Sequence, residues 1–345
     1  MDNMDFMDGA LLTIRSLARA RVGAMVAGTM ILHITNGDCA AQQLQASGLP
    51  GVVLPWRDVL HEGPLLAGRD LARRRQLRAA FLNALGWAEL GPTARWLAAR
   101  DGLLAGRARF TELVLWFEPD LYDQLQVLEI LNQLTPGHPA DPPLSQTALV
   151  PLVGALSAEE MRAAYQARTL LPAASVALAA QAWDLLCQPD PRGLQQAASL
   201  TLPDLPAAVP ALHRLLEDYP DAHGLSRSER QILSCFTEPT TPMVAFTRQD
   251  RDEPHRFMGD WCFMLHLRRL ASGRHPLLQS ADGQALTPED LPLAPGPKSP
   301  HWRRPLLVAS PGRAVLAGQA DAIALNGIRR WVAGVALTGQ PDHRR

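Results

Sequence analysis

The chain predicts an α/β protein with an N-terminal Rossmann-like parallel-sheet domain, a helical middle segment and a C-terminal winged-helix-like domain. Short apolar runs alternate with helical patterns over residues 30–153, which is typical of parallel strands joined by right-handed crossovers. Residues 154–223 are Ala- and Leu-rich and helical in pattern. Over residues 224–345, three helical segments precede two short strand candidates, which is the order of elements in a winged helix.

The N-terminal 29 residues carry no motif and precede the first strand, so we expect residues 1–29 to be a disordered extension, with an over-extended start codon as one explanation. Their arginines are followed by no long apolar core, which argues against a signal peptide. No run reaches the roughly 18 apolar residues of a membrane helix. The four cysteines form no C-x-x-C pair, which favours neither a zinc site nor a disulfide framework, so we expect a reducing cytoplasm.

Each element follows from apolar spacing and from turn or capping residues. In the N-terminal domain, strands are expected at 31–35, 52–54, 113–117 and 148–153, and helices at 39–46, 69–85, 93–99 and 121–134. A Pro-rich link at 136–143 precedes helices over 157–219, the first of which is capped by Ser157. In the C-terminal domain, helices are expected at 226–236 (a Ser226–Glu229 capping box), 241–247 and 259–270, and strands at 275–279 and 305–309.

Composition limits the classes of function. Apolar residues make up 47% and charged residues 19% of the chain, as in a globular protein. Residues 224–345 carry a net charge of +5 within a total of −1, which permits contact with an anionic polymer. Lysine occurs once, at Lys298 in a Pro/Gly-rich stretch, so the chain has no P-loop and no candidate Schiff-base lysine.

Three motifs end in carboxylates where predicted strands end: residues 34–38 (ITNGD), 55–64 (PWRDVLHEGP) and 116–120 (WFEPD). The carboxyl ends of parallel strands meet at one edge of a sheet and form a crevice that binds ligands. We therefore expect one polar site, with Asp38, Asp58, Glu62 and Glu118 converging on it.

Each motif also has a structural alternative. Asp38 and Asp120 are suited to cap the helices that follow them. Arg57 is suited to pair with an acid of the third motif, which would make the second motif a latch. Trp56 and Trp116 fit the core better than a base-stacking platform, because large aromatic side chains are usually buried.

The functional interpretation assigns roles to ten of these residues. Carboxylate oxygens suit a hard divalent cation, for which Mg²⁺ and Mn²⁺ are the candidates, and they suit unaided acid/base catalysis equally well. The predicted catalytic residues are Asp58, His61, Glu62 and Glu118; the substrate-binding residues are Asn36, Arg57, Trp56 and Gln124; the metal ligands are Asp38, Glu62, Glu118 and Asp120.

The C-terminal arginines are candidates for phosphate contacts. They are Arg227, Arg230, Arg268 and Arg269. The third predicted helix, however, is mostly apolar, whereas a recognition helix needs polar side chains for base edges. Packing or protein contact is therefore the better interpretation of this domain, and nucleic-acid binding stays open.

The first two motifs, with residues 115–118 (LWFE) and 120–125 (DLYDQL), resemble a bacterial family described as domain of unknown function 1835. Residues 224–233 (GLSRSERQIL) and 326–331 (NGIRRW) resemble its frequent companion, domain of unknown function 3658. The first resemblance covers about residues 30–134, and it implies no activity. Relatives carry His where this chain has Pro119, so one imidazole of the family's pattern is missing here.

Two functions follow. The first is an enzyme that hydrolyses, or transfers a group from, a small polar or phosphorylated substrate in an acidic crevice. No redox cofactor motif is visible, which disfavours oxidoreduction. The alternative is a ligand-sensing regulator whose C-terminal domain contacts a protein or DNA.

Overall fold

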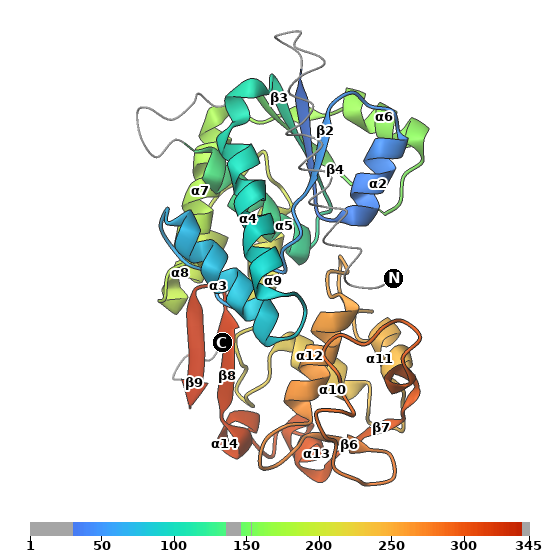
Figure 1. Cartoon of the computed structure of the whole chain (residues 1–345). Coiled ribbons are helices and arrows are strands. Elements are labelled where there is room, and N and C mark those ends of the chain that lie inside the picture. Colours follow the sequence, from blue (N-terminus) through green and yellow to red (C-terminus); the bar gives the residue numbers. More distant parts are fainter. Residues whose placement is uncertain (1–29, 136–145, 153, 340–345) are drawn as a thin grey trace.

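A computed structural model describes residues 30–135, 146–152 and 154–339. The predicted N-terminal extension, the Pro-rich link and Val153 lie outside these described residues. The α/β part occupies the upper half of Figure 1, and the C-terminal region lies below it. Within the described ranges, no helix is long and apolar enough to cross a membrane.

A five-stranded sheet forms the centre of the α/β part, with strand order β2-β1-β3-β4-β5. Adjacent pairs among β1 to β4 are parallel, and β5 is antiparallel to β4. The parallel α/β architecture predicted from the sequence is therefore confirmed. The strands are β1 (Ile31–Thr35), β2 (Val52–Pro55), β3 (Glu112–Phe117), β4 (Gln146–Pro151) and β5 (Thr169–Leu170).

Helices cover both faces of the sheet (Figure 1). Every residue of β3 is buried, as expected for a central strand covered on both sides. Val114 and Trp116 pack with α2 (Asp38–Ala46) and α6 (Ala158–Gln166), whereas Leu113 and its same-face neighbours pack in the larger core. That core includes residues of α3 (Leu71–Ala84), α4 (Leu90–Ala105), α5 (Leu121–Leu134), α7 (Ala173–Leu186), α8 (Pro191–Ala198) and α9 (Ala208–Leu216).

The described part of the C-terminal region contains five α-helices and two small antiparallel sheets, so the winged helix predicted here is not confirmed. Strands β6 and β7 pair with each other, and β8 and β9 form a second two-stranded sheet that was not predicted. The elements are α10 (Arg227–Ser234), α11 (Pro242–Arg248), α12 (Asp260–Leu270), β6 (Leu278–Ser280), β7 (Leu306–Val308), α13 (Ser310–Leu316), α14 (Ala322–Asn326), β8 (Ile328–Val332) and β9 (Val335–Gly339).

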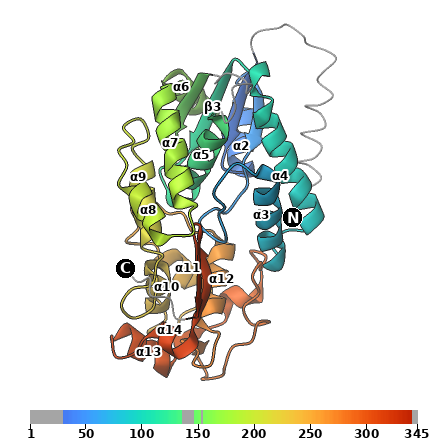
Figure 2. The same cartoon turned by 90° about the vertical axis from the view of Figure 1, so that its left-hand side faces the viewer.

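The β8–β9 hairpin joins the two halves of the molecule. In Figure 2 it appears as the red hairpin that rises from the lower region to the lower end of α7. Its turn accepts a hydrogen bond from the Leu65 backbone N–H through the Ala333 carbonyl, and the Gly334 N–H donates to the Leu186 carbonyl. A Cβ at Gly334 would lie 2.1 Å from the Cys187 carbonyl oxygen, so this close backbone contact requires glycine.

Candidate functional site

The first motif is held by two separate contacts at the end of β1. The Asn36 side chain donates to both carboxylate oxygens of Asp123, at 2.9 and 3.1 Å. Gly37, not Asp38, is the N-cap of α2, and its position leaves the Asp38 carboxylate free to pair with Arg57. The alternative of Asp38 as a helix cap is therefore wrong.

Arg57 is fixed in place by an acid and an aromatic ring. Its Nε lies 2.9 and 3.0 Å from the two Asp38 oxygens, and its guanidinium carbon lies 4.5 Å from the centre of the Trp96 ring. The partner acid thus comes from the first motif, not from the third as the latch alternative supposed. Arg57 has φ +45°, an unusual conformation for a side chain of this size, as the turn after β2 requires.

Both tryptophans of the motifs lie in the interior, as the core interpretation expects. Trp56 and Trp116 have no exposed surface. The Trp56 Nε1–H donates to Glu129 at 2.7 Å, and the Trp116 Nε1–H donates to His33 at 3.0 Å. Neither ring is placed to stack on a ligand.

Asp58 of the second motif forms a buried ion pair with Arg78. The Arg78 guanidinium of α3 donates to one Asp58 oxygen at 2.7 and 3.1 Å. The same guanidinium donates to the backbone carbonyls of Val59 at 2.9 Å and Glu62 at 2.7 Å. Arg78 therefore holds the loop in one conformation, a role that no sequence motif indicated.

His61 is enclosed by aromatic rings. The ring centres of Tyr122 and Phe257 lie 5.8 and 5.3 Å from that of the imidazole, both edge-on. Burial lowers the pKa of His61 to about 4, so the ring is neutral near pH 7. Phe257 belongs to the C-terminal region, so His61 lies where the two halves of the molecule meet.

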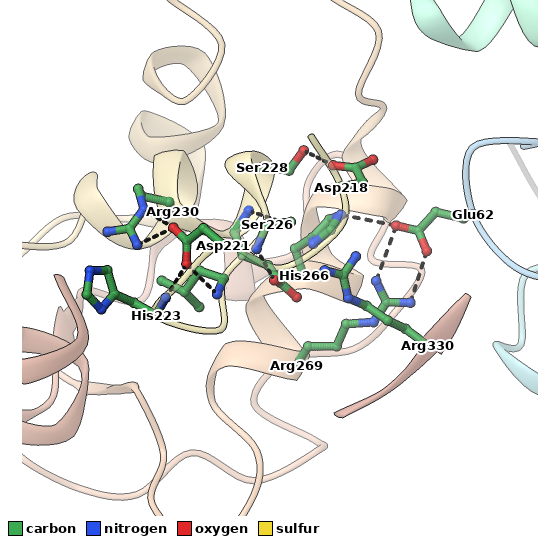
Figure 3. A network of polar contacts seen from close by, with 12 residues as sticks. Glu62, Asp218, Asp221, His223, Ser226, Ser228, Arg230, His266, Arg269 and Arg330 are labelled. Carbon is green, nitrogen blue, oxygen red and sulfur yellow. Dashed lines mark hydrogen bonds and ion pairs between the residues drawn. The ribbon is translucent and has the colours of Figure 1, made fainter. Parts of the chain in front are cut away.

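Glu62 also contacts the C-terminal region, as Figure 3 shows. Its carboxylate accepts hydrogen bonds from Arg269 at 2.9 and 3.2 Å and lies 3.1 Å from the His266 Nε2. Burial alone would raise the pKa of Glu62, but the Arg269 charge and the His266 hydrogen bond outweigh it and hold the pKa well below its usual value. Glu62 therefore links α12 to the second motif.

The third motif begins α5. Asp120 is the N-cap, and its carboxylate accepts from the Asp123 backbone N–H at 2.9 Å, which confirms the capping role. The Glu118 N–H donates to the Asp123 carboxylate, and the Gln124 side chain donates to the Glu118 carbonyl at 2.7 Å. The Glu118 and Gln124 contacts thus close the turn between β3 and α5.

Asp120 and Asp123 have displaced pKa values. Burial raises the pKa of Asp120 to about 6, and the negative charge of Glu118 adds to the shift. Burial also raises the pKa of Asp123 well above its usual value, with the charge of Asp120 as a further cause. Two neighbouring acids with raised pKa values are typical of acid/base sites.

Asp120 lines a cavity of about 500 Å³ between the two halves of the molecule. The cavity lies among the start of α5, the helix α9, and residues 253–257 of the C-terminal region. A volume of this size accommodates a small organic ligand. Further lining side chains are His213, Arg214, Glu217, Arg227, Glu253, His255 and Phe257.

The cavity charges are organised around Arg214. Its guanidinium donates to Glu253 at 2.8 Å, Asp218 at 3.2 Å and Ser228 at 2.7 Å, and it lies over the Phe257 ring at 5.0 Å. Sequence reasoning missed this residue, because Arg214 sits in an otherwise apolar helix without a motif.

The predicted site residues do not come together in one group, and Asp58 pairs separately with Arg78. Asn36, Glu118, Asp120 and Gln124 come together through Asp123 and the turn before α5, whereas Asp38 pairs with Arg57 and Glu62 pairs with α12. Among the residues that the structure describes, no group of three or more His, Cys, Asp or Glu side chains is arranged to hold a metal ion.

The four C-terminal arginines suggested as phosphate contacts all have internal partners. Arg227 pairs with Glu217 at 2.7 Å, and Arg230 pairs with Asp221. Arg268 donates to the Pro288 carbonyl at 2.5 Å, and Arg269 pairs with Glu62.

The chain was compared with protein-family models and with curated proteins. No protein-family model and no curated protein matches the chain. The resemblance to the two families of unknown function stays a prediction from the quoted motifs.

Proposed function

We propose that this protein is an enzyme that hydrolyses, or transfers a group from, a small polar substrate bound in the cavity beside Asp120. The observation that carries the proposal is a carboxyl group with a pKa of about 6 that lines a cavity of about 500 Å³ after a parallel strand. Such strand ends are where open α/β sheets bind ligands. A catalytic acid or base works best with a pKa near the working pH.

In this proposal, Asp120 is the group that exchanges a proton with the substrate or with an attacking water. Its carboxyl is mostly ionised at pH 7, so it accepts a proton in the first step and returns it to the leaving group. Arg227 lines the same cavity with a side chain 27% exposed, and in this proposal an oxygen of the substrate takes the place of its contact with Glu217. For hydrolysis, the oxygen of a water molecule bonds to the substrate as its proton passes to Asp120, and the bond to the leaving group breaks as Asp120 returns that proton to it.

We expect Asp120→Asn to lower turnover by about 10²- to 10⁴-fold, the usual contribution of a positioned acid or base. The assay follows the hydrolysis of p-nitrophenyl phosphate and of p-nitrophenyl acetate by the full chain over pH 5–8. Wild-type activity should fall as the pH drops through about 6, because Asp120 becomes protonated there. Asp70→Asn is the matched control, since Asp70 caps α3 outside the cavity, and it should keep full activity.

Asp120→Asn should lower turnover but raise stability. The folded pKa of Asp120 is raised, so its contribution to stability is lost as the pH rises from about 4 through 6. Asparagine keeps the cap and cannot ionise, so Asp120→Asn should be more stable than wild type at pH 7 by about 2 kcal/mol. Unchanged turnover in Asp120→Asn, or an Asp120 carboxyl that titrates near pH 4 by nuclear magnetic resonance, would contradict the proposal.

The second candidate is a ligand-sensing regulator, which is favoured by the position of the cavity between the two halves of the molecule. A ligand there contacts both α5 and the C-terminal region, so its binding can change how they meet. We further propose that α10, α11 and α12 with the β6–β7 pair form a winged-helix-like unit. What supports this is their order and the antiparallel pairing of the two strands.

We expect this unit not to read DNA directly. In α12, Cys262, Phe263, Met264, Leu265, His266, Leu267 and Leu270 are buried, so few side chains are available for base edges. Selection from a random duplex library with the full chain should recover no defined motif, and any binding should weaken steeply with salt. A recovered motif whose binding is lost in Arg268→Ala would favour the regulator.

A further inference from the structure

A second cavity of about 210 Å³ lies in the C-terminal region, beyond the end of α12. Its walls come from the end of α12, the helix α14 and the start of β8, together with backbone at Gly224, Gly273 and Gly327. The volume is below the roughly 300–1,000 Å³ of sites for drug-sized ligands. A small ion or metabolite is therefore the appropriate size of occupant.

The charge of the lining is positive. Three arginines (Arg269, Arg329 and Arg330) and one carboxylate, that of Glu229, line the cavity, and Arg269 is paired with Glu62. Glu229 is already engaged, because its carboxylate accepts the Ser226 backbone N–H at 2.9 Å in the capping box of α10. The cavity lining thus contains more arginines than carboxylates.

Arg330 is incompletely paired. Its side chain is 4% exposed, and its contact with Glu229 is long, at 3.4 Å. The Arg330 Nε–H is buried and has no hydrogen-bond partner within the described part of the chain. Because buried guanidinium groups are normally bound by several acceptors, this arrangement lacks an acceptor.

Arg269 is the second arginine of the site. Its guanidinium holds the Glu62 carboxylate with two hydrogen bonds, and 23% of its side chain is exposed. Figure 3 draws Arg269 and Arg330 in the same polar network. Both residues line the second cavity, so an acceptor bound there can contact both guanidinium groups.

We propose that this cavity binds a small oxyanion, either a phosphate or a carboxylate, between Arg269 and Arg330. Both anions present two adjacent oxygens, which a guanidinium group can bind with two parallel hydrogen bonds. The site is separate from the cavity beside Asp120, so it does not depend on the proposed enzymatic function. Because Arg269 also holds Glu62, an anion here acts on the contact between α12 and the second motif.

The test is isothermal titration of the full chain with inorganic phosphate and, separately, with acetate, at constant ionic strength set by chloride. We expect saturable binding of at least one anion, weakened at least tenfold in Arg330→Met. Ser272→Glu is a second variant, because Ser272 is exposed, lines the cavity and would bring a carboxylate to it. It should weaken binding to a similar extent and decides the question if Arg330→Met does not fold.

Arg192→Met is the matched control, since Arg192 is a surface arginine with a side chain 78% exposed and lies outside this cavity. It should bind like wild type. Binding of phosphate alone identifies a phosphate group as the ligand, and binding of acetate alone identifies a carboxylate. Absence of saturable binding to both anions, or affinities that neither Arg330→Met nor Ser272→Glu changes, would overturn the proposal.

Discussion

Replacement of Arg78 by methionine is expected to lower the free energy of unfolding by about 3–5 kcal/mol, the usual cost of removing one partner of a buried ion pair. The variant leaves the Asp58 carboxylate buried without its counter-charge. It also removes donors to the carbonyls of Val59 and Glu62, so the second motif loses the contacts that fix its conformation. Urea denaturation followed by circular dichroism measures the loss.

Arg73→Met is the matched control for Arg78→Met. Arg73 lies on the same helix, α3, and is exposed, so its replacement should change stability by no more than about 0.5 kcal/mol. Asp58→Leu should lower the free energy of unfolding less in the Arg78→Met variant than in wild type. In Arg78→Met the carboxylate is already unpaired, so its removal breaks no ion pair. A loss below about 1 kcal/mol in Arg78→Met would show that the loop is held by other contacts.

Replacement of Glu62 by glutamine is the second large effect, with an expected loss of about 3 kcal/mol at pH 7. The amide keeps the size of the side chain but leaves Arg269 without its buried counter-charge. Unfolding should be measured by thermal melting and by urea, with Glu289→Gln, an exposed position, as the control.

The pH dependence of this difference follows from the lowered pKa of Glu62. The stabilisation is complete above the unfolded pKa of about 4.3 and is lost as the pH falls through the lower folded value. Wild type and Glu62→Gln should therefore approach each other in stability below about pH 4, while the gap at pH 6–8 stays constant.

The Glu62 experiment also distinguishes a link to α12 from a metal site. If Glu62 binds a cation, Mg²⁺ or Mn²⁺ should raise the melting temperature of wild type, and the unliganded variant should be no less stable because one repelling acid is gone. If Glu62 links the second motif to α12, the variant melts lower with and without metal, and wild type does not respond. The hydrogen bonds from Arg269 and His266 favour the second result.

Much of the α/β part is predictable because its signals are local. The first strand, the third strand and α5 lie within a residue of their expected bounds, since apolar periodicity and turn residues act over a few positions. Ser157 caps its helix and the Ser226–Glu229 capping box forms, both as predicted. The Asp120 side chain is likewise a helix cap, as its position before a leucine-rich helix predicts.

The assignment of partners is where sequence reasoning failed. The structural alternative paired Arg57 with an acid of the third motif, whereas Arg57 pairs with Asp38 of the first. The acids at the strand ends suggested a shared cation, whereas Asp38, Asp58 and Glu62 each meet an arginine. A motif shows which charges are present, but not which opposite charge the fold brings to them.

The sequence alone determined the parallel sheet, the burial of Trp56 and Trp116, and the position of polar residues at the carboxyl ends of strands. These properties depend on side-chain periodicity and on caps that act within one turn. Only the tertiary structure decided that Glu62 meets Arg269, 207 residues further along the chain, and that Asp120 faces a cavity shared with the C-terminal region. Such contacts arise from how whole elements pack, and an ion pair between distant segments leaves no pattern in the sequence near either partner.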